Sequence, residues 1–190
     1  MIAPSPMADT IAIALGANLG DPAATLAAVR PLLAELVQPA RCRWSPLFRT
    51  EPVGGPADQP PYCNAVLLLG PPLPPLPHLE PHALLRQLQA LESRFGRQRL
   101  VHWGPRSLDL DLLWWGDLVC DDAALQLPHP RLLERSFVLA PLAAIDAELV
   151  PPGQPSGGPA LTCQALLEQL LPQLDEAPPL ALAGSDDWPA

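Results

Sequence analysis

The residue types best suited to chemistry in this 190-residue chain gather between residues 97 and 111. Three arginines, Arg97, Arg99 and Arg106, precede two aspartates, Asp109 and Asp111, which are separated by a single residue. Guanidinium groups form paired hydrogen bonds with phosphate oxygens, and closely spaced carboxylates can hold a hard cation such as Mg²⁺. The spacing therefore predicts a site for a metal-bound polyphosphate.

The two aspartates occupy alternate positions of an apolar run. A β-strand would turn both carboxylates to one face and the leucines at 108, 110 and 112 to the other. Two adjacent carboxylates repel each other unless a positive charge lies between them, and a divalent cation supplies that charge. An isolated Asp-x-Asp more often lies on a solvated strand face, but the arginine loop before it favours the metal interpretation.

The loop before the aspartates holds two further candidates. His102 adds to its cationic character, and the Gly104-Pro105 turn would direct Arg106 toward the carboxylates. Trp103 is expected either to stack on a ligand or to anchor the loop in the core. A polar loop of this kind can become ordered when an anion binds.

Other candidates lie elsewhere in the sequence. Asn64, close to Tyr62, offers a donor and an acceptor on one amide, which suits the edge of a heterocycle, although a lone asparagine is more often a turn former. His129, Arg135 and Phe137 offer phosphate contacts and an aromatic lid. Each of them could equally be an ordinary surface or core residue.

Composition narrows the class of protein. The net charge of −9 disfavours a nucleic-acid or anionic-membrane surface, since both select basic proteins. All eleven basic residues are arginines, so the chain has no lysine for a Walker P-loop, a Schiff base or a Ser-Lys dyad. With 48% hydrophobic residues, the chain can form one globular domain without disulfide or metal staples.

The cysteines and the hydropathy indicate where the protein works. Cys42, Cys63, Cys120 and Cys163 are scattered, without Cys-x-x-Cys spacing, as expected for free thiols in a reducing compartment. No apolar run reaches the ~20 residues of a membrane span. We expect a cytoplasmic protein, a monomer, with small-molecule rather than nucleic-acid or membrane partners.

Apolar periodicity and turn residues divide the chain into alternating elements. Strands are expected at residues 10–15, 41–50, 64–69 and 108–115, and helices at residues 21–38, 82–95, 131–145 and 162–171. Pro46 predicts an edge position or a bulge in the second strand. The order of elements predicts an α+β fold, a ferredoxin-like βαββαβ antiparallel sheet with helices on one face and C-terminal helical additions.

The remaining segments are expected to be irregular. Residues 1–9 would form a disordered leader and residues 172–190 an irregular tail, on either side of a single domain at residues 10–171. Residues 70–81 are rich in proline and would form an extended surface connector.

Six segments between Ile11 and about Val150 carry a resemblance to a known family. They are Leu15-Gly-Ala-Asn-Leu-Gly20, Arg49-Thr-Glu-Pro-Val-Gly54, Gln59-Pro-Pro-Tyr-Cys-Asn64, Glu92 with Gly96-Arg-Gln-Arg99, Trp103-Gly-Pro-Arg-Ser-Leu-Asp-Leu-Asp111, and Pro128-His-Pro with Arg135-Ser-Phe-Val-Leu-Ala-Pro-Leu142. Together they resemble the 6-hydroxymethyl-7,8-dihydropterin pyrophosphokinases of folate biosynthesis. The Gly-Pro-Arg-x-x-Asp-x-Asp segment is the most specific of the six.

The resemblance implies transfer of the terminal pyrophosphoryl group of ATP to the hydroxymethyl group of a reduced pterin, leaving AMP. It implies that Asp109 and Asp111 bind two Mg²⁺ ions, and that these aspartates with Arg97, Arg99 and Arg106 carry the catalysis. The nucleotide side would comprise Gln89, Glu92, Arg97, Arg99, Trp103, Arg106, His129 and Arg135. The pterin side would comprise Thr50, Val53, Tyr62, Asn64, Trp103 and Phe137. His102 departs from the family, which usually has arginine there.

Two other functions remain open on sequence grounds. A ferredoxin-like module that binds RNA or phosphate would normally display aromatic residues on central strands and a basic face, whereas this chain is acidic and its strands are aliphatic. A metal-dependent phosphohydrolase could use the same aspartates, but it would release ADP or phosphate without any pterin.

Overall fold

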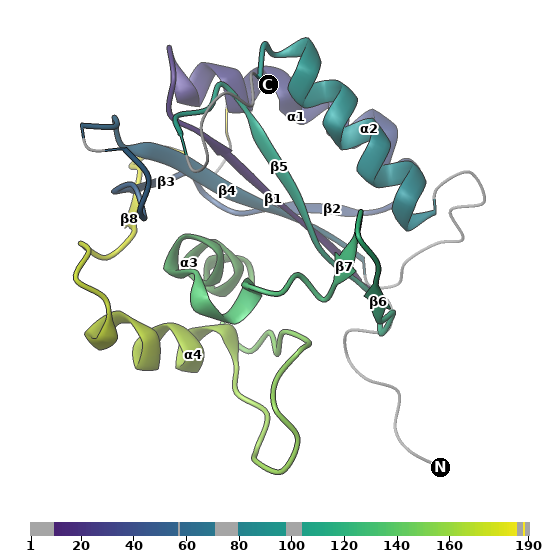
Figure 1. The fold of residues 1–190 in the computed structure, drawn as a ribbon, viewed down its shortest axis with the longest axis vertical. Helices are drawn as coiled ribbons and strands as arrows, with labels where there is room; N and C mark the ends of the chain where they lie inside the picture. Colours follow the sequence, from purple (N-terminus) through teal and green to yellow (C-terminus); the bar gives the residue numbers. More distant parts are fainter. Residues whose placement is uncertain (1–9, 57, 71–79, 98–103, 186–187, 189–190) are drawn as a thin grey trace.

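A computed structural model describes residues 10–56, 58–70, 80–97, 104–185 and 188. Its architecture is α+β, with a six-stranded antiparallel sheet and helices on both faces (Figure 1). The strands of this sheet are β1 (Ile11–Ala17), β2 (Cys42–Trp44), β3 (Phe48–Thr50), β4 (Tyr62–Leu69), β5 (Asp109–Trp115) and β8 (Leu180–Ala181). They follow the order β5-β1-β4-β3-β8, with β2 also paired to β4.

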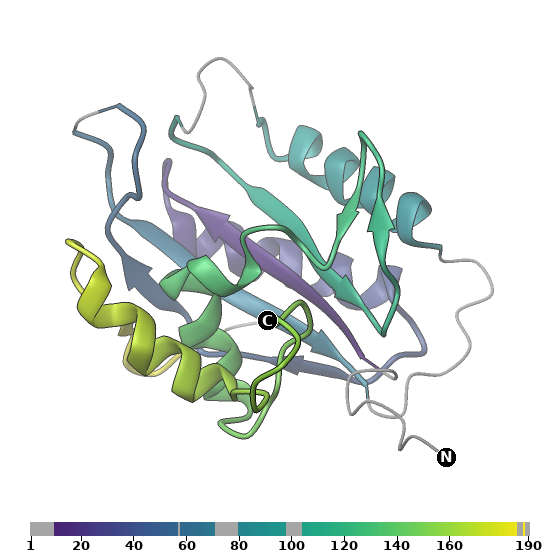
Figure 2. The ribbon, with the colours of Figure 1, turned by 60° about the horizontal axis from the view of Figure 1, so that its bottom comes forward.

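The sheet is buried on both faces because a helix pair covers each one. α1 (Pro22–Leu36) and α2 (Pro81–Arg94) cover one face, and α3 (Ser136–Ile145) and α4 (Cys163–Leu170) cover the other (Figures 1 and 2). Alternation along β1 serves both layers, since Ile11 and Ile13 pack with α1 and α2 whereas Ala12 packs with α3. The two central strands are therefore almost continuously apolar, as in a sheet with no solvated face.

The two long helices begin and end close to the predicted positions. Asp21 caps α1, because its Oδ1 accepts a hydrogen bond from the Ala24 N–H at 3.0 Å, and Pro22 is the first helical residue. α2 ends shortly before Gly96, which has a φ of +78°. Residues with a side chain rarely adopt this backbone conformation, so glycine is favoured here. These boundaries decide which residues of α2 face β5.

Among the described residues, no helix is long and apolar enough to span a bilayer.

The strand expected at residues 41–50 is in fact two strands, β2 and β3. Ser45, Pro46 and Leu47 interrupt it, because Pro46 has no N–H to donate to the ladder. The hydroxyl of Ser45 accepts a hydrogen bond from the Val66 N–H at 3.0 Å and so replaces a backbone partner. Both strands pair with β4, so the irregularity predicted from Pro46 is a complete break between them.

The tail expected to be irregular adds a strand to the sheet. Leu180–Ala181 form β8, which pairs with β3, so β3 is not an edge strand. Farther along, the Trp188 side chain is 3% exposed and donates from Nε1 to the Ser45 carbonyl at 2.8 Å. It also lies against Trp44, with ring centroids 5.3 Å apart, and under the guanidinium of Arg30. The tail was mispredicted here because long-range packing, not local sequence, orders it.

Short elements complete the structure. The strands β6 (Cys120–Asp121) and β7 (Gln126–Leu127) form a separate hairpin after β5, and one-turn 3₁₀ helices lie at Leu132–Glu134 and Leu171–Gln173. The predicted leader at residues 1–9 and most of the predicted connector, residues 71–79, lie outside the described residues. The division of the chain at residue 171 stays a prediction.

Candidate active site

The carboxylates of Asp109 and Asp111 lie at the start of β5, on the face opposite α1 and α2. The intervening and flanking leucines are buried in the core beneath those helices, so the predicted alternation of the strand is present. On the neighbouring strand β1, Asp109 pairs with Gly16 and Asp111 with Ala14. These partners have little or no side chain, so they leave space beside the carboxylates, and all four residues line the same pocket.

Cationic side chains from three segments meet these carboxylates. Arg106 forms an ion pair with Asp109, and Nη1 of Arg97 lies 2.6 Å from the other Asp109 oxygen, Oδ1. Arg135 donates to Oδ2 of Asp111 at 3.0 Å. The two groups of opposite charge, which the sequence places on separate elements, therefore share one cleft.

Glu92 supports this arrangement from behind. It is 3% exposed on α2, and its Oε1 forms an ion pair with Arg97 and accepts a hydrogen bond from the Leu110 N–H at 2.8 Å. One buried carboxylate therefore fixes a helix, a strand and an arginine to one another. Its predicted part in nucleotide binding stays a prediction, and its observed contacts orient Arg97.

Asn18 holds the loop that carries Arg106. Its backbone N–H donates to the Arg106 carbonyl at 2.9 Å, and its Oδ1 accepts from the Arg106 N–H at 2.6 Å. Its Nδ2 also donates to the Pro60 carbonyl at 3.1 Å. Sequence reasoning did not single out this residue, although it belongs to the Gly-Ala-Asn-Leu-Gly segment that ends β1 and begins the following turn.

Burial and charge shift several pKa values in the cleft. Burial and the negative charge of Asp111 raise the pKa of the Asp109 carboxyl. The guanidinium groups of Arg106 and Arg97 oppose this shift without cancelling it. Burial lowers the pKa of His129, with nearby arginines acting in the same direction. A cation at the aspartates would relieve the repulsion that raises the Asp109 pKa.

A partly enclosed pocket lies on one side of the carboxylates. It is lined by the residues predicted for the pterin side that the structure describes, namely Thr50, Val53, Tyr62, Asn64 and Phe137. Asn64 is 6% exposed and donates from Nδ2 to the Thr50 hydroxyl at 2.7 Å. Tyr62 donates its hydroxyl to the Gly104 carbonyl at 3.3 Å, and the guanidinium of Arg135 lies 5.5 Å from the Phe137 ring centroid.

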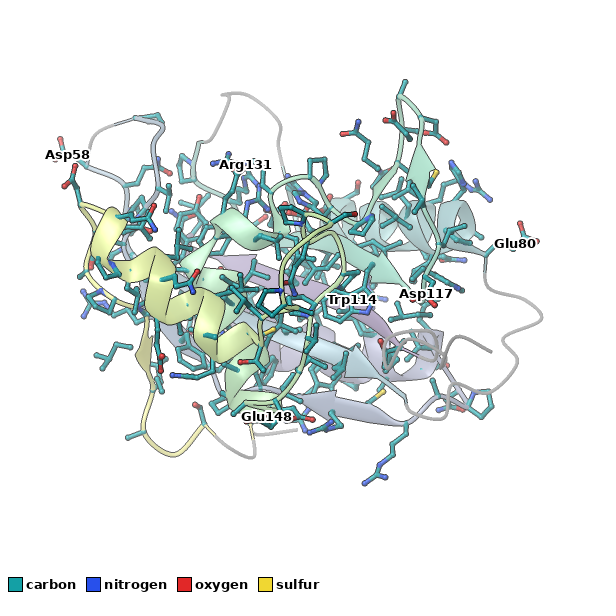
Figure 3. The ribbon with its side chains drawn as sticks, turned by 90° about the horizontal axis from the view of Figure 1, so that it is seen from below. Asp58, Glu80, Trp114, Asp117, Arg131 and Glu148 are labelled. Atoms are coloured by element: carbon teal, nitrogen blue, oxygen red, sulfur yellow. The ribbon has the colours of Figure 1, made fainter. Side chains whose placement is uncertain are left out.

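A wider cleft opens on the other side. Its lining includes Gln89, Glu92, Arg97 and His129 among the predicted nucleotide-side residues. Both hollows share four lining residues, Arg106, Asp111, Arg131 and Arg135. Arg131, labelled in Figure 3, precedes α3 and was not predicted; only its basic character next to Pro128-His-Pro could have suggested it.

The structure brings together most of the predicted residues. Arg99 and Trp103 lie outside the described residues, so their positions stay predictions, as does the effect of His102. The roles assigned to the others also stay predictions. The geometry provides paired carboxylates at the junction of a small, partly enclosed pocket and a wider, arginine-lined cleft.

Comparison with known proteins identifies relatives of this arrangement. The family model for 7,8-dihydro-6-hydroxymethylpterin-pyrophosphokinase matches residues 12–147. A 2-amino-4-hydroxy-6-hydroxymethyldihydropteridine pyrophosphokinase of Pseudomonas aeruginosa is 39% identical over 143 residues, covering 75% of this chain and 84% of the relative. Proteins of the same name are 38% identical over 143 residues in Haemophilus influenzae (75% and 85% covered) and 37% identical over 184 residues in Synechocystis sp. (91% and 83% covered).

Proposed function

Because the chain belongs to the 7,8-dihydro-6-hydroxymethylpterin-pyrophosphokinase family, we propose that its cleft moves the terminal pyrophosphoryl group of ATP to the hydroxymethyl group of 6-hydroxymethyl-7,8-dihydropterin. The chain is a pyrophosphokinase of folate biosynthesis, and its products are the pterin diphosphate and AMP. One observation carries the proposal of the site: the pocket and the wider cleft are both lined by Asp111, Arg106 and Arg135.

The enclosed pocket suits the pterin. Asn64 and Thr50 offer hydrogen-bonding groups at its floor, and Tyr62 and Phe137 offer aromatic surfaces to a flat ring. Pockets for small ligands commonly combine apolar walls with a few fixed polar groups in this way. The pterin would enter with its hydroxymethyl group toward the aspartates, where the pyrophosphoryl group must arrive.

The wider cleft suits the nucleotide. Arg97, Arg106 and Arg135 can form charge-assisted hydrogen bonds with the triphosphate, and Gln89 of α2 can contact the rest of the nucleotide. Burial keeps the pKa of His129 low, so at neutral pH this side chain would bind a phosphate through a hydrogen bond and not through charge. The family resemblance assigns Arg99 and Trp103 to the same ligand.

The aspartates fit Mg²⁺. Oδ1 of Asp109 is buried and makes no hydrogen bond, although Arg97 lies 2.6 Å away, and Asp111 faces both hollows. Carboxylate oxygens next to a phosphate site are the ligands this ion prefers. We expect Asp109 and Asp111 to hold two ions together with the phosphates; when bound, they neutralise phosphate charge and orient the reacting oxygens.

The arginines change partners during binding. In the free protein, Arg97 and Arg106 neutralise Asp109, so none of these charges is buried alone. When the triphosphate arrives, both guanidinium groups can turn from the carboxylate to phosphate oxygens over a short distance. The hydroxyl oxygen of the pterin then attacks the β-phosphorus in line, and its proton passes to solvent. The bond between the β-phosphorus and the oxygen that bridges to the α-phosphorus breaks, AMP leaves with this oxygen, and the arginines stabilise the charge on the moving group.

Three wider features belong to the same proposal. The strand order β5-β1-β4-β3 with two crossing helices on one face supports a ferredoxin-like βαββαβ topology. Four unpaired cysteines support a reducing, cytoplasmic location. We also expect the protein to be a monomer.

The direct test is a reaction of the protein with Mg-ATP and 6-hydroxymethyl-7,8-dihydropterin, followed by separation of AMP from ADP. Asp109→Ala and Asp111→Ala should each abolish AMP formation while far-ultraviolet circular dichroism stays unchanged. Asp117→Ala is a matched control, because Asp117 is an exposed aspartate in the turn directly after β5. The control should react at the normal rate.

Three results would contradict the proposal. Near-normal turnover in both aspartate variants would end the metal assignment. Release of ADP, or AMP formation without pterin, would place the chemistry in another class. An equally slow Asp117→Ala would show that the losses do not come from the cleft.

A further inference from the structure

Three metal-ligating side chains meet outside the cleft's centre, between the start of α2 and the β6–β7 hairpin. His82, Cys120 and Asp122 each offer one ligand atom, and these three atoms all lie within 4.8 Å of one another. The imidazole lies 2.7 Å from the carboxylate oxygen, and the sulfur lies 3.7 Å from the same oxygen. His82 is the second residue of α2, and the hairpin runs beside the first turns of this helix (Figures 1 and 2).

Local structure fixes the direction of two of these groups. Cys120 is the first residue of β6 and Asp122 directly follows this strand, and the 3.7 Å contact between the Cys120 sulfur and Oδ2 of Asp122 places the two side chains on the same side of the hairpin. Oδ1 of Asp122 accepts hydrogen bonds from the Ala124 and Leu125 N–H groups at 2.7 and 2.8 Å. With Oδ1 held by the backbone, Oδ2 points at the histidine and the cysteine.

We propose that His82, Cys120 and Asp122 bind one divalent transition-metal ion of the zinc type, with water as a fourth ligand. Imidazole nitrogen, thiolate sulfur and carboxylate oxygen are the ligand types of tetrahedral zinc sites. Donor atoms in such a site lie roughly 3.3–3.7 Å apart, since the metal–ligand bonds are about 2.0–2.3 Å long. The sulfur–oxygen separation of 3.7 Å already fits, and the exposed imidazole needs only a small side-chain rotation.

Binding is a simple ligand exchange. The Cys120 S–H bond breaks, its proton passes to solvent, and the thiolate forms a bond to the ion, which loses hydration waters. No oxidant or reductant takes part. A soft sulfur ligand selects against Mg²⁺, so the site differs in chemistry from the oxygen ligands Asp109 and Asp111.

The ion would join two walls of the open cleft. The hairpin residues Asp122 to Gln126 line that cleft, and so do Gln89 and Glu92, which follow His82 on α2. A metal bond between the hairpin and the helix would restrain the distance between these walls. This consequence rests on the proposed function, whereas metal binding itself does not.

Cobalt(II) titration of the reduced, metal-free full-length protein tests the site directly. A thiolate ligand produces a sulfur-to-cobalt charge-transfer band, and four-coordination produces strong visible d–d bands. The titration is run with excess Mg²⁺, which occupies the aspartates of the cleft and has no thiolate band. We expect saturation at one cobalt per chain and displacement of the bands by Zn²⁺.

The variants assign the ligands. Cys120→Ala should abolish the charge-transfer band, and His82→Ala and Asp122→Asn should each weaken cobalt binding on the order of tenfold or more. Asp122→Asn retains an oxygen for the two backbone hydrogen bonds, so the turn is preserved. Cys42→Ala is the matched control, because Cys42 is the other half-buried free thiol and lies in β2.

The proposal is wrong if the wild-type protein shows no thiolate band, since His82 and Asp122 would then form an ion pair only. It is also wrong if the band survives in Cys120→Ala or disappears in Cys42→Ala. Circular dichroism of each variant separates loss of a ligand from loss of the fold. Since cobalt absorption does not depend on catalysis, the outcome is independent of whether AMP is formed.

Discussion

Replacing Gly16 by alanine tests how the floor of the enclosed pocket is built. Gly16 in β1 pairs with Asn64 in β4, and a Cβ on Gly16 would lie 2.7 Å from Oδ1 of Asn64. Unbonded carbon and oxygen atoms do not pack this closely, so one of them must move. β1 is hydrogen-bonded on both sides, to β4 and to β5, and therefore the Asn64 amide moves more easily than the strand.

The cost follows from what the amide does in the wild-type protein. Asn64 is buried and donates to the Thr50 hydroxyl at 2.7 Å. Breaking this bond and leaving a buried polar group without a partner costs about 1–3 kcal/mol. If the same amide binds the pterin, its displacement leaves a polar group of the bound pterin without that partner, at a similar cost in binding free energy. At about 1.4 kcal/mol for each factor of ten, Gly16→Ala should bind pterin roughly 5- to 150-fold more weakly.

Calorimetric titration with the pterin and, separately, with a non-hydrolysable ATP analogue measures the effect. Pterin affinity should fall, whereas affinity for the ATP analogue should not change, because Gly16 lines only the enclosed pocket of the two described hollows. Gly158→Ala is the matched control. A Cβ at Gly158 meets no atom within 4 Å, and its backbone is not in the left-handed region. This variant should bind both ligands normally.

Two outcomes decide against the reasoning. Unchanged pterin affinity in Gly16→Ala would refute the placement of the pterin over Asn64. An equal loss for both ligands, together with a lower melting temperature, would show that the sheet deforms instead of the side chain.

Three further changes test the supports of the cleft and the tail. Trp188→Ala should lower the free energy of unfolding by about 3–5 kcal/mol in urea denaturation, because a buried indole and its hydrogen bond are lost, and an unchanged midpoint would contradict the packing. Glu92→Gln should lower it by about 1.5–3 kcal/mol, because Arg97 loses one carboxylate partner and keeps another, Asp109, and a stabilised variant would overturn the role given to Glu92. The pKa of His129 is lower in the folded than in the unfolded protein. As the pH falls below about 6.5, the unfolded state therefore binds more protons than the folded state, and the free energy of unfolding declines. His129→Gln should therefore reduce the loss of melting temperature between pH 7.5 and pH 5.5, and an identical loss in both proteins would refute this cause.

Local sequence determined the parts of the structure that depend on local forces. The cap at Asp21-Pro22 and the stop at Gly96 set the ends of the two long helices, and the alternation around Asp109 set the face of β5. The meeting of the arginines with the aspartates could be predicted because a Gly-Pro turn joins them within a few residues. The family resemblance added the pocket residues on distant strands.

Other features depend on residues far apart in the chain. The break at Pro46 is local, but its repair by Ser45 needs Val66 of a different strand. The His82–Asp122 contact joins residues 40 apart, and Glu92 reaches the Leu110 backbone across 18 residues. Single-residue patterns carry no sign of such contacts, since each partner alone is ordinary for its element.

The late position of β8 and Trp188 in the sequence has a consequence for synthesis on the ribosome. The outer side of β3 receives its partner strand, and the indole of Trp44 its aromatic neighbour Trp188, only after residues 180–188 have been made, although β3 and β4 can pair more than 100 residues earlier. During that interval the nascent chain presents an unpaired strand edge, which other unfinished chains can extend by intermolecular pairing. We therefore expect protection of this edge during synthesis to raise the yield of native protein, separately from the stability of the finished fold.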